Sequence, residues 1–250
     1  MQPSGLLLVL MVYDEGGVRL ESQNLKYRHE FKYTVNTPQI ILLENRIKHI
    51  MDPDANAGDT GVYNIRSLYF DDYYDRCFKE NENGTDPREK FSIRIYNASS
   101  EKITLECKRK EKGKTLKTFC PLTLQQAQKL IRGIPLDNIS SQHPVLRKLT
   151  LEMLTKRMKP VVIVSYDRKP FVCKDGNVRV TLDMNISSSS AVETFLNKKI
   201  PHRLIMPSGQ HLLEVKFDEY LPDYIYQGLQ LNSLRQTTFS KYYMCRKYRW

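Results

Sequence analysis

Five segments of the chain alternate charged and apolar residues with a period of two, which is the period of a β-strand. One parity of these segments is charged at 13 of its 16 positions, nine basic and four acidic. This charged parity consists of Arg28, Glu30, Lys32, Arg88, Lys90, Ser92, Arg94, Thr104, Glu106, Lys108, Lys110, Arg179, Thr181, Asp183, Glu214 and Lys216. The other parity is apolar except at His29, Glu89 and Arg109. The pattern therefore predicts strands with one apolar and one charged face.

The charged face is unusual for a sheet that meets bulk water. A half-exposed antiparallel sheet gives some of this pattern, but its wet face usually mixes Ser, Thr, Asn and Gln with the charges. Here Glu and Lys alternate two residues apart in three strands, at Glu30/Lys32, Glu106/Lys108 and Glu214/Lys216. We predict an α+β fold: a closed antiparallel β-barrel of about eight strands with a charged interior and helices packed on the outside.

The predicted interior carries more cations than anions, and so does the whole chain. There are 39 Lys and Arg against 28 Asp and Glu, a formal net charge of +11. Buried charge is costly unless it is paired, so the excess predicts a polyanionic ligand whose charge is spread along its length, such as a chain of phosphates. Carboxylates among the cations predict a divalent cation held between carboxylate and phosphate oxygens. A nucleic acid would need the basic residues on an open face, so none is expected.

The chain organisation indicates one main domain. Residues 1–26 are expected to form a poorly ordered leader or an edge strand, and residues 27–250 a single domain. The apolar run Leu6–Val12 is shorter than the roughly 20 residues that span a bilayer. Five scattered cysteines without a C-x-x-C pair favour a reducing compartment, and we expect a cytoplasmic protein.

Four segments have helical character, and two others read as connections. Helices are expected over Pro38–Met51, over His143–Lys159, over Pro222–Gly228, and from an N-cap at Thr123 to about Arg132. Ser187–Ser190 reads as a short serine linker. The acidic run that follows the strand Val62–Phe70 reads as a solvated turn; its members are Asp71, Asp72 and Asp75.

Eight short motifs resemble, in order, those of a known superfamily. They are Tyr27–Tyr33, Tyr63–Asp71, Lys90–Asn97, Leu105–Lys108, Arg179–Asp183, Leu212–Lys216, Leu221–Tyr224 and Phe239–Tyr242. Each motif is weak alone, but eight in the right order over nearly the whole chain are specific. The chain resembles the triphosphate tunnel metalloenzymes, which include CYTH domains. Within them it is most similar to the polyphosphate polymerase (VTC, vacuolar transporter chaperone) domain family in its bacterial form.

The resemblance implies a function and a set of site residues. It implies transfer of the terminal phosphoryl group of ATP to inorganic polyphosphate with Mn²⁺ or Mg²⁺, and a separate integral membrane protein as a further partner. The implied catalytic residues are Lys32, Arg94, Lys108, Arg179 and Lys241; further phosphate contacts are Arg66, Lys90, Arg168 and Lys216; the implied metal ligand is Glu214. The charged parity adds Glu30 and Glu106 as expected helpers of Glu214. Strand parity alone does not place Arg66, Arg168 and Lys241 on the charged face.

One departure from the family pattern leaves alternatives open. Yeast-type polymerases have R-x-R where this chain has Ser92-Ile93-Arg94, so the first arginine is replaced by serine. The same tunnel would act as a triphosphatase on ATP or another triphosphate if water attacked in place of a phosphate chain. A non-catalytic polyphosphate-binding module is the third possibility, although the chain keeps Glu214 and nearly all of the basic positions.

Overall fold

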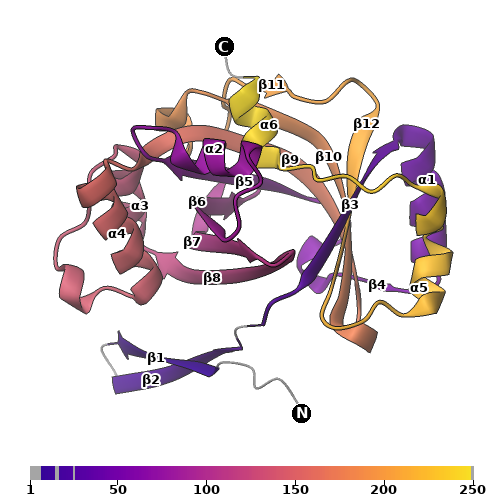
Figure 1. Cartoon of the computed structure of the whole chain (residues 1–250), viewed down its shortest axis with the longest axis horizontal. Helices are drawn as coiled ribbons and strands as arrows, with labels where there is room; N and C mark the ends of the chain where they lie inside the picture. Colours follow the sequence, from indigo (N-terminus) through magenta and orange to yellow (C-terminus); the bar gives the residue numbers. More distant parts are fainter. Residues whose placement is uncertain (1–6, 15–16, 25, 249–250) are drawn as a thin grey trace.

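The computed structural model describes residues 7–14, 17–24 and 26–248. They form an α+β structure with one large sheet and one hairpin (Figure 1). The strands are β1 Leu7–Asp14, β2 Gly17–Asn24, β3 His29–Asn36, β4 Asp52–Pro53, β5 Tyr63–Asp71, β6 Arg88–Tyr96, β7 Ser99–Glu111, β8 Lys114–Leu122, β9 Lys159–Cys173, β10 Val178–Ser189, β11 Arg203–Leu204 and β12 Gln210–Phe217. The α-helices are α1 Thr37–Ile47, α2 Arg76–Glu82, α3 Leu124–Ile131, α4 Pro144–Lys156, α5 Asp223–Gly228 and α6 Lys241–Lys247.

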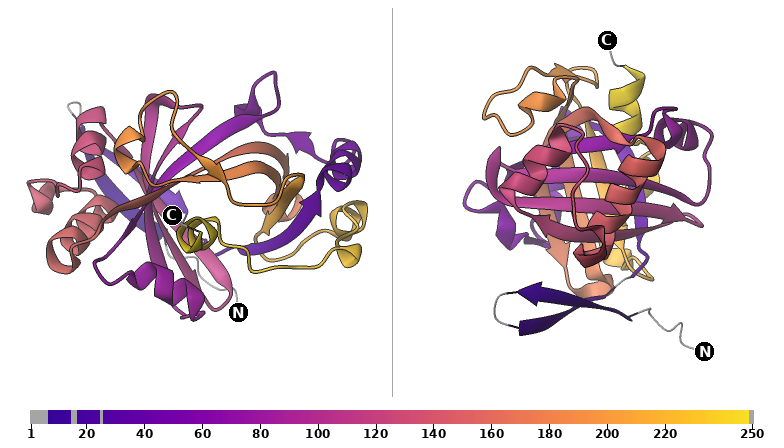
Figure 2. Two further views of the ribbon diagram at one scale, coloured as in Figure 1. Left: turned by 90° about the horizontal axis from the view of Figure 1, so that it is seen from above. Right: turned by 90° about the vertical axis from the view of Figure 1, so that its left-hand side faces the viewer.

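The large sheet curls back on itself (Figures 1 and 2). Its main path runs β3-β12-β10-β9-β5-β6-β7-β8, and every neighbouring pair is antiparallel. The two end strands meet where Arg28 and Thr115 exchange both backbone hydrogen bonds at 2.9 Å. The predicted antiparallel barrel of eight strands is therefore confirmed, and a single bridge joins its first and last strands.

Apolar side chains on the outside of the curled sheet form two hydrophobic cores. One joins β3, β10 and β12 to α1 and α5, with residues such as Val180 and Leu213 fully buried. The other joins β5, β6, β7 and β9 to α3 and α4, with Ile93 and Leu105 fully buried. Helix α3 begins as the sequence predicts, because the Thr123 hydroxyl accepts from the N–H of Gln126 in a capping box. The helices thus cover the apolar parity and leave the charged parity inside.

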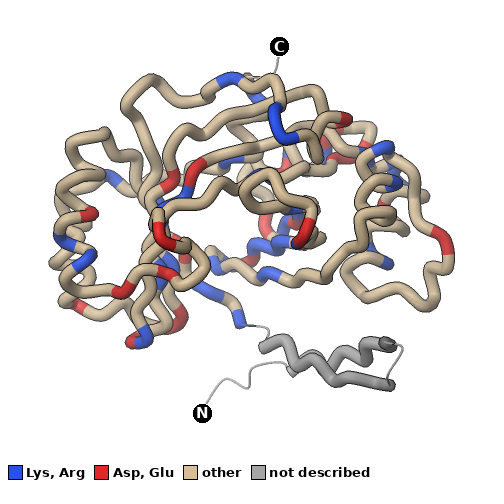
Figure 3. The backbone as a smooth tube through the Cα atoms, turned by 180° about the vertical axis from the view of Figure 1, so that it is seen from behind, with Lys and Arg blue, Asp and Glu red and all other residues tan. Residues whose placement is uncertain are grey.

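Strand register brings the charged parity together. Directly opposed residues of antiparallel strands project to the same face. Lys32 on β3 lies opposite Glu214 on β12, and Lys90 on β6 lies opposite Lys108 on β7. Ser92 lies opposite Glu106, so it also faces the interior. Figure 3 shows basic and acidic positions intermixed along these central strands. The sheet therefore has the charged inner face that the alternation predicts.

Some local predictions are wrong. Ser187–Ser190 is not a linker, because Ser187 and Ser189 pair with β9 as part of β10. The run after β5 is not a solvated turn: Asp71 is fully buried, and its carboxylate accepts the backbone N–H groups of Asp72, Cys77 and Phe78. Spacing alone did not show that this acidic run caps a helix.

The predicted leader holds a hairpin. Strands β1 and β2 pair with each other in a sheet of their own and add no edge to the large sheet. Residues 1–6, 15–16 and 25 of the leader lie outside the described residues. No helix among the described residues combines the length and the apolar character needed to cross a bilayer.

Candidate functional site

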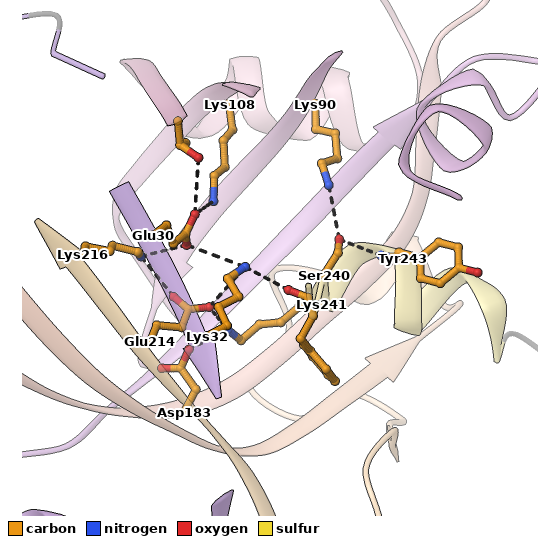
Figure 4. Close-up of polar contacts among 12 residues, drawn as sticks. Glu30, Lys32, Lys90, Lys108, Asp183, Glu214, Lys216, Ser240, Lys241 and Tyr243 are labelled. Carbon is orange, nitrogen blue, oxygen red and sulfur yellow. Dashed lines mark hydrogen bonds and ion pairs between the residues drawn. The ribbon is translucent and has the colours of Figure 1, made fainter. Parts of the chain in front are cut away.

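The centre of the inner face is a buried network around Glu214 (Figure 4). Glu214 Oε1 accepts from Lys241 Nζ at 2.6 Å and lies 3.8 Å from Lys32 Nζ. Its other oxygen, Oε2, lies 3.1 Å from Lys216 Nζ and 3.4 Å from an Arg168 nitrogen. One carboxylate therefore contacts four cations from β3, β9, β12 and α6.

Asp183 is a second buried carboxylate in this network. Arg168 donates to both of its oxygens, at 2.7 Å each, in the two-pronged geometry that suits guanidinium and carboxylate. Lys241 Nζ contacts Asp183 at 2.6 Å as well as Glu214. Lys241 is the first residue of helix α6, whose N-cap is Ser240. Helix α6 thus inserts one ammonium group between two buried carboxylates.

Glu30 extends the network toward β7. Its carboxylate accepts from Lys108 Nζ at 2.8 Å and lies 3.6 Å from Lys216 Nζ and 3.7 Å from Lys32 Nζ. Lys216 and Lys32 therefore bridge Glu30 and Glu214, as Figure 4 shows. The side chain of Lys108 is 41% exposed, which leaves part of its ammonium group open to a ligand.

A second ion-pair group lies along β6, β7 and β8. Glu106 is buried and contacts Arg94 at 3.2 Å and Lys117 at 2.5 Å. Arg94 also donates to the Ser67 hydroxyl at 3.1 Å. In this group, one carboxylate pairs with two cations.

Lys90 is an interior cation with which no carboxylate pairs among the described residues. Its ammonium group donates to the Asn81 side-chain oxygen of α2 at 2.8 Å and to the Ser240 hydroxyl at 3.3 Å. It also lies 5.2 Å from the centre of the Tyr242 ring. Burial, then the positive charges of Lys108 and Lys32, lower the pKa of Lys90 to about 7.

The network shifts the pKa of its acidic members strongly. Burial raises the pKa of Glu214, but Lys241, Lys216 and Lys32 outweigh it and hold that pKa well below its usual range. Burial likewise raises the pKa of Glu30, but the neighbouring lysines outweigh it, Lys108 most of all, and hold that pKa well below its usual range. Both groups therefore stay ionised at neutral pH.

The pKa shifts of the bases follow how closely the carboxylates approach them, because the two carboxylates nearest Lys241 both lie at 2.6 Å, whereas those nearest Lys32 and Lys216 lie at 3.1–3.8 Å. Desolvation lowers the pKa of Lys32 and of Lys216, and their acidic neighbours compensate only in part. Desolvation also acts on Lys241, yet Asp183 and Glu214 raise its pKa. Lys241 is thus the most firmly held ammonium group of the network, and it supports α6 against the sheet.

The structure does not bring every predicted site residue to the network. Arg66 lies on the face of β5 opposite to Ser67 and donates to the backbone carbonyls of Phe195 and Asn197, so it supports a loop outside the barrel. Arg179 has the inward parity but lies near the start of β10, where it contacts Asp54 at 2.7 Å and the Tyr63 hydroxyl at 3.0 Å. Neither contacts the central carboxylates.

The predicted group of metal ligands is also divided. Glu30 and Glu214 share Lys32 and Lys216, whereas Glu106 pairs with Arg94 and Lys117. Among the described residues, no three Asp, Glu, His or Cys side chains gather at a metal-binding spacing. Of the three predicted metal ligands, Glu30 and Glu214 therefore belong to one network and Glu106 to another.

Sequence reasoning missed two members of the site. Asp183 was on the charged parity but was not named as a site residue, although the pairing of its strand with β9 places it opposite Arg168. Lys117 lies on β8, which was not sorted by parity, and its register opposite Lys108 turns it inward. Sorting the segment Thr115–Pro121 by parity was the signal that could have found Lys117.

Lys90 and the two ion-pair groups together hold more cations than carboxylates. The cations are Lys32, Lys90, Arg94, Lys108, Lys117, Arg168, Lys216 and Lys241, and the carboxylates are Glu30, Glu106, Asp183 and Glu214. With every group ionised, eight cations face four carboxylates. Such a surface is suited to bind a linear anion that carries several negative charges.

Solved structures with the same architecture support this description. A putative adenylyl cyclase from Hippeastrum, described as having a dominant triphosphatase activity, superposes with a TM-score of 0.55 at 12% identity, over 89% of this chain and 96% of that one. A putative adenylate cyclase from Bacillus halodurans gives 0.50 at 16% identity, over 86% and 94%. The chain therefore shares the fold of these two proteins.

The family follows from the sequence match. The VTC domain model matches residues 27–248, nearly the whole chain, so the protein belongs to the VTC domain family. Among curated proteins, none matches the chain.

Proposed function

We propose that this protein is a metal-dependent polyphosphate polymerase, which transfers the terminal phosphoryl group of ATP to a growing inorganic polyphosphate chain. The observation that carries the proposal is the excess of cations over carboxylates on the inner face of the barrel. Phosphoryl transfer depends on positioning and on charge stabilisation more than on a covalent intermediate. An extended triphosphate would supply the negative charge that the free site lacks.

The cations divide into two roles in this proposal. Lys32, Lys108 and Lys216 would bind phosphate oxygens, because each already shares a carboxylate with another cation. Lys241 would hold the phosphoryl group that transfers, from the N-terminus of α6. The terminal oxygen of polyphosphate would attack the γ-phosphorus in line, the bond to the β–γ bridging oxygen would break, and ADP would leave.

A divalent cation fits the donors that are present. Glu214 and Glu30 offer only carboxylate oxygens, the ligand type that Mg²⁺ and Mn²⁺ prefer. Mg²⁺ is commonly held by one or two carboxylates together with substrate phosphates, so two carboxylates suffice. When bound, the cation would neutralise charge on the phosphate oxygens. We propose Glu214 as its main ligand and Glu30 as the second, because these two carboxylates belong to one network, whereas Glu106 pairs with Arg94 and Lys117 in a separate group.

A triphosphatase is the second candidate, and one comparison favours it. The Hippeastrum neighbour of the same fold is described as having a dominant triphosphatase activity. In that case water replaces the polyphosphate end as the attacking group, and the same cations bind the triphosphate. A polyphosphate-binding module without catalysis would use the cations alone.

The setting of the protein in the cell is part of the proposal. We propose that it works in the cytoplasm and hands its product to a separate integral membrane protein. The five cysteines are free thiols, which suits a reducing compartment.

Product analysis distinguishes the three activities. The purified protein is incubated with ATP and Mn²⁺, and ADP, phosphate and polyphosphate are separated by chain length. A polymerase adds one phosphate to long-chain polyphosphate for each ADP that it releases, whereas a triphosphatase gives ADP and free phosphate. Binding of tripolyphosphate without turnover of ATP would leave only the binding module.

Proton uptake on binding tests the role of Lys90. An anion beside Lys90 raises its pKa from about 7, so above neutral pH the bound state carries more protons than the free state, and affinity falls as pH rises. Calorimetry in buffers of different ionisation enthalpy measures this uptake. We expect wild type to take up a larger fraction of a proton per tripolyphosphate than Lys90→Met.

The comparison of the two proteins cancels protons that the ligand itself gains or loses. Lys102→Met serves as the control, because Lys102 is exposed on β7. Equal uptake by wild type and Lys90→Met at pH 8 would show that Lys90 does not face the bound anion.

A further inference from the structure

A cavity adjoins the charged network at one end of the barrel. It has a volume of about 580 Å³, within the range of small-molecule sites. Its walls come from three places: the C-terminal end of β3 with the start of β12, the segment that begins with β11, and helix α6 with the residues before it. None of the predicted site residues lines it.

The lining of this cavity differs in chemistry from the network. Leu204, Ile205, Met206, Phe239 and Met244 give it an apolar wall. Lys, Arg, His, Asp and Glu are all absent from the lining residues. A phosphate chain would lose its ionic contacts on entering, so the cavity suits an uncharged part of a ligand.

Two polar side chains and one further aromatic ring complete the lining. Thr34 contributes a hydroxyl, Gln210 an amide and Tyr248 a phenol ring. A flat heteroaromatic ring stacks on aromatic side chains, and methionine sulfur makes favourable contacts with ring edges. The hydroxyl and the amide can donate and accept hydrogen bonds. These features together match a nucleobase and its ribose.

The cavity is continuous with the phosphate-binding residues. Thr34 lies two residues beyond Lys32 on β3, which is about 7 Å along the same face. Lys32 Nζ donates to the carbonyl of Phe239, a lining residue, at 2.9 Å. Met244 lies three residues after Lys241 on α6, so both project from one side of that helix.

We propose that this cavity binds the nucleoside part of a nucleoside triphosphate whose phosphates lie along the cation network. The inference rests on the proposed function and adds to it, because it separates nucleotides from inorganic triphosphate as substrates. The network alone would bind both. The apolar cavity would favour the ligand that carries a base.

Paired titrations of two ligands test this inference. ATP and inorganic tripolyphosphate are titrated into each protein at one fixed Mg²⁺ concentration. Contacts between methionine sulfur and an aromatic ring are worth up to about 1.5 kcal/mol, so Met244→Ala should weaken ATP binding by up to about tenfold. Binding of tripolyphosphate should change by less than about twofold, because Met244 contacts no phosphate in this arrangement.

Two further variants keep the test independent of folding defects. Leu204 is 52% exposed, so Leu204→Trp can fill the cavity without disturbing a core, and it should also weaken ATP selectively. Leu154→Ala, at a residue 54% exposed on α4, is the control and should leave both affinities unchanged.

The outcomes separate the inference from the proposed function. Selective loss of ATP affinity in Met244→Ala and Leu204→Trp is the expected result. Tripolyphosphate binding by wild type with no selective loss in either variant overturns the nucleoside site alone. Failure of wild type to bind tripolyphosphate overturns the proposed function and this inference with it.

Discussion

Glu214→Gln should abolish metal-dependent turnover while the protein still binds polyanions. The substitution removes the negative charge that would hold a divalent cation, and it leaves Lys241, Lys216 and Lys32 in place. Loss of a metal contact is worth several kcal/mol in the transition state, so we expect kcat to fall at least about a hundredfold. In the absence of metal, tripolyphosphate should bind to Glu214→Gln more tightly than to wild type, because the variant lacks one negative charge that repels the ligand.

The same substitution should reveal the energetic role of the anion. Removing one partner of a buried ion pair typically costs about 3 kcal/mol or more, so the ligand-free variant should melt at a lower temperature than wild type. Tripolyphosphate should restore most of this loss by binding the folded state. The matched control is Glu219→Gln, because Glu219 is 59% exposed in its side chain and lies outside the network. A variant with full Mn²⁺-dependent turnover would contradict the proposed metal site.

Strand alternation predicted most of the inner face because it depends on local geometry alone. Lys32, Lys108, Glu30, Glu214 and Lys216 were placed on one face by counting residues, and their contacts now join β3, β7 and β12. Counting works here because a strand has a fixed period and the outer face must bury apolar side chains. The curl of the sheet then converts one face into an interior.

The remaining members depend on contacts that no periodicity encodes. Lys241 belongs to a helix, so parity was silent, and only the resemblance indicated it. Arg66 was carried over from the resemblance, yet it has the parity opposite to Ser67 and points away from the interior. Sorting β5 by the same rule as the other strands would have excluded it.

The acidic run after β5 shows a different limit. Asp71 caps α2 through backbone contacts, and its carboxylate also accepts from the Tyr242 hydroxyl of α6, a partner 171 residues away. Helix α6 in turn places Lys241 in the network. A sequence pattern shows where carboxylates occur, but only the tertiary structure shows that this one ties two short helices together.

Lys241→Met should strongly destabilise the protein. Lys241 Nζ lies 2.6 Å from both Asp183 and Glu214, and the removal of this ammonium group leaves two buried carboxylates with only their other partners. Breaking a buried pair by removing one partner costs about 3–5 kcal/mol. We expect a loss of this size in the free energy of unfolding at pH 7, measured by urea denaturation. Lys247→Met, on the exposed end of the same helix, should change it by less than about 0.5 kcal/mol.

The pH dependence separates this ionic cause from a packing defect. Lys241 is the leading cation that lowers the pKa of Glu214, and it also lowers that of Asp183. In wild type the two carboxylates stabilise the fold above their unfolded-state pKa, and this contribution is lost as pH falls through the lowered folded-state values. In Lys241→Met the folded-state pKa values of both carboxylates are higher than in wild type, because that cation is gone. The carboxylates of the variant are therefore protonated at a higher pH, and their protonation removes the cost of burying a poorly paired charge. The difference in unfolding free energy should therefore shrink as pH falls below 4.5, the ordinary glutamate value. A difference that stays constant with pH would assign the effect to lost packing by the lysine stem.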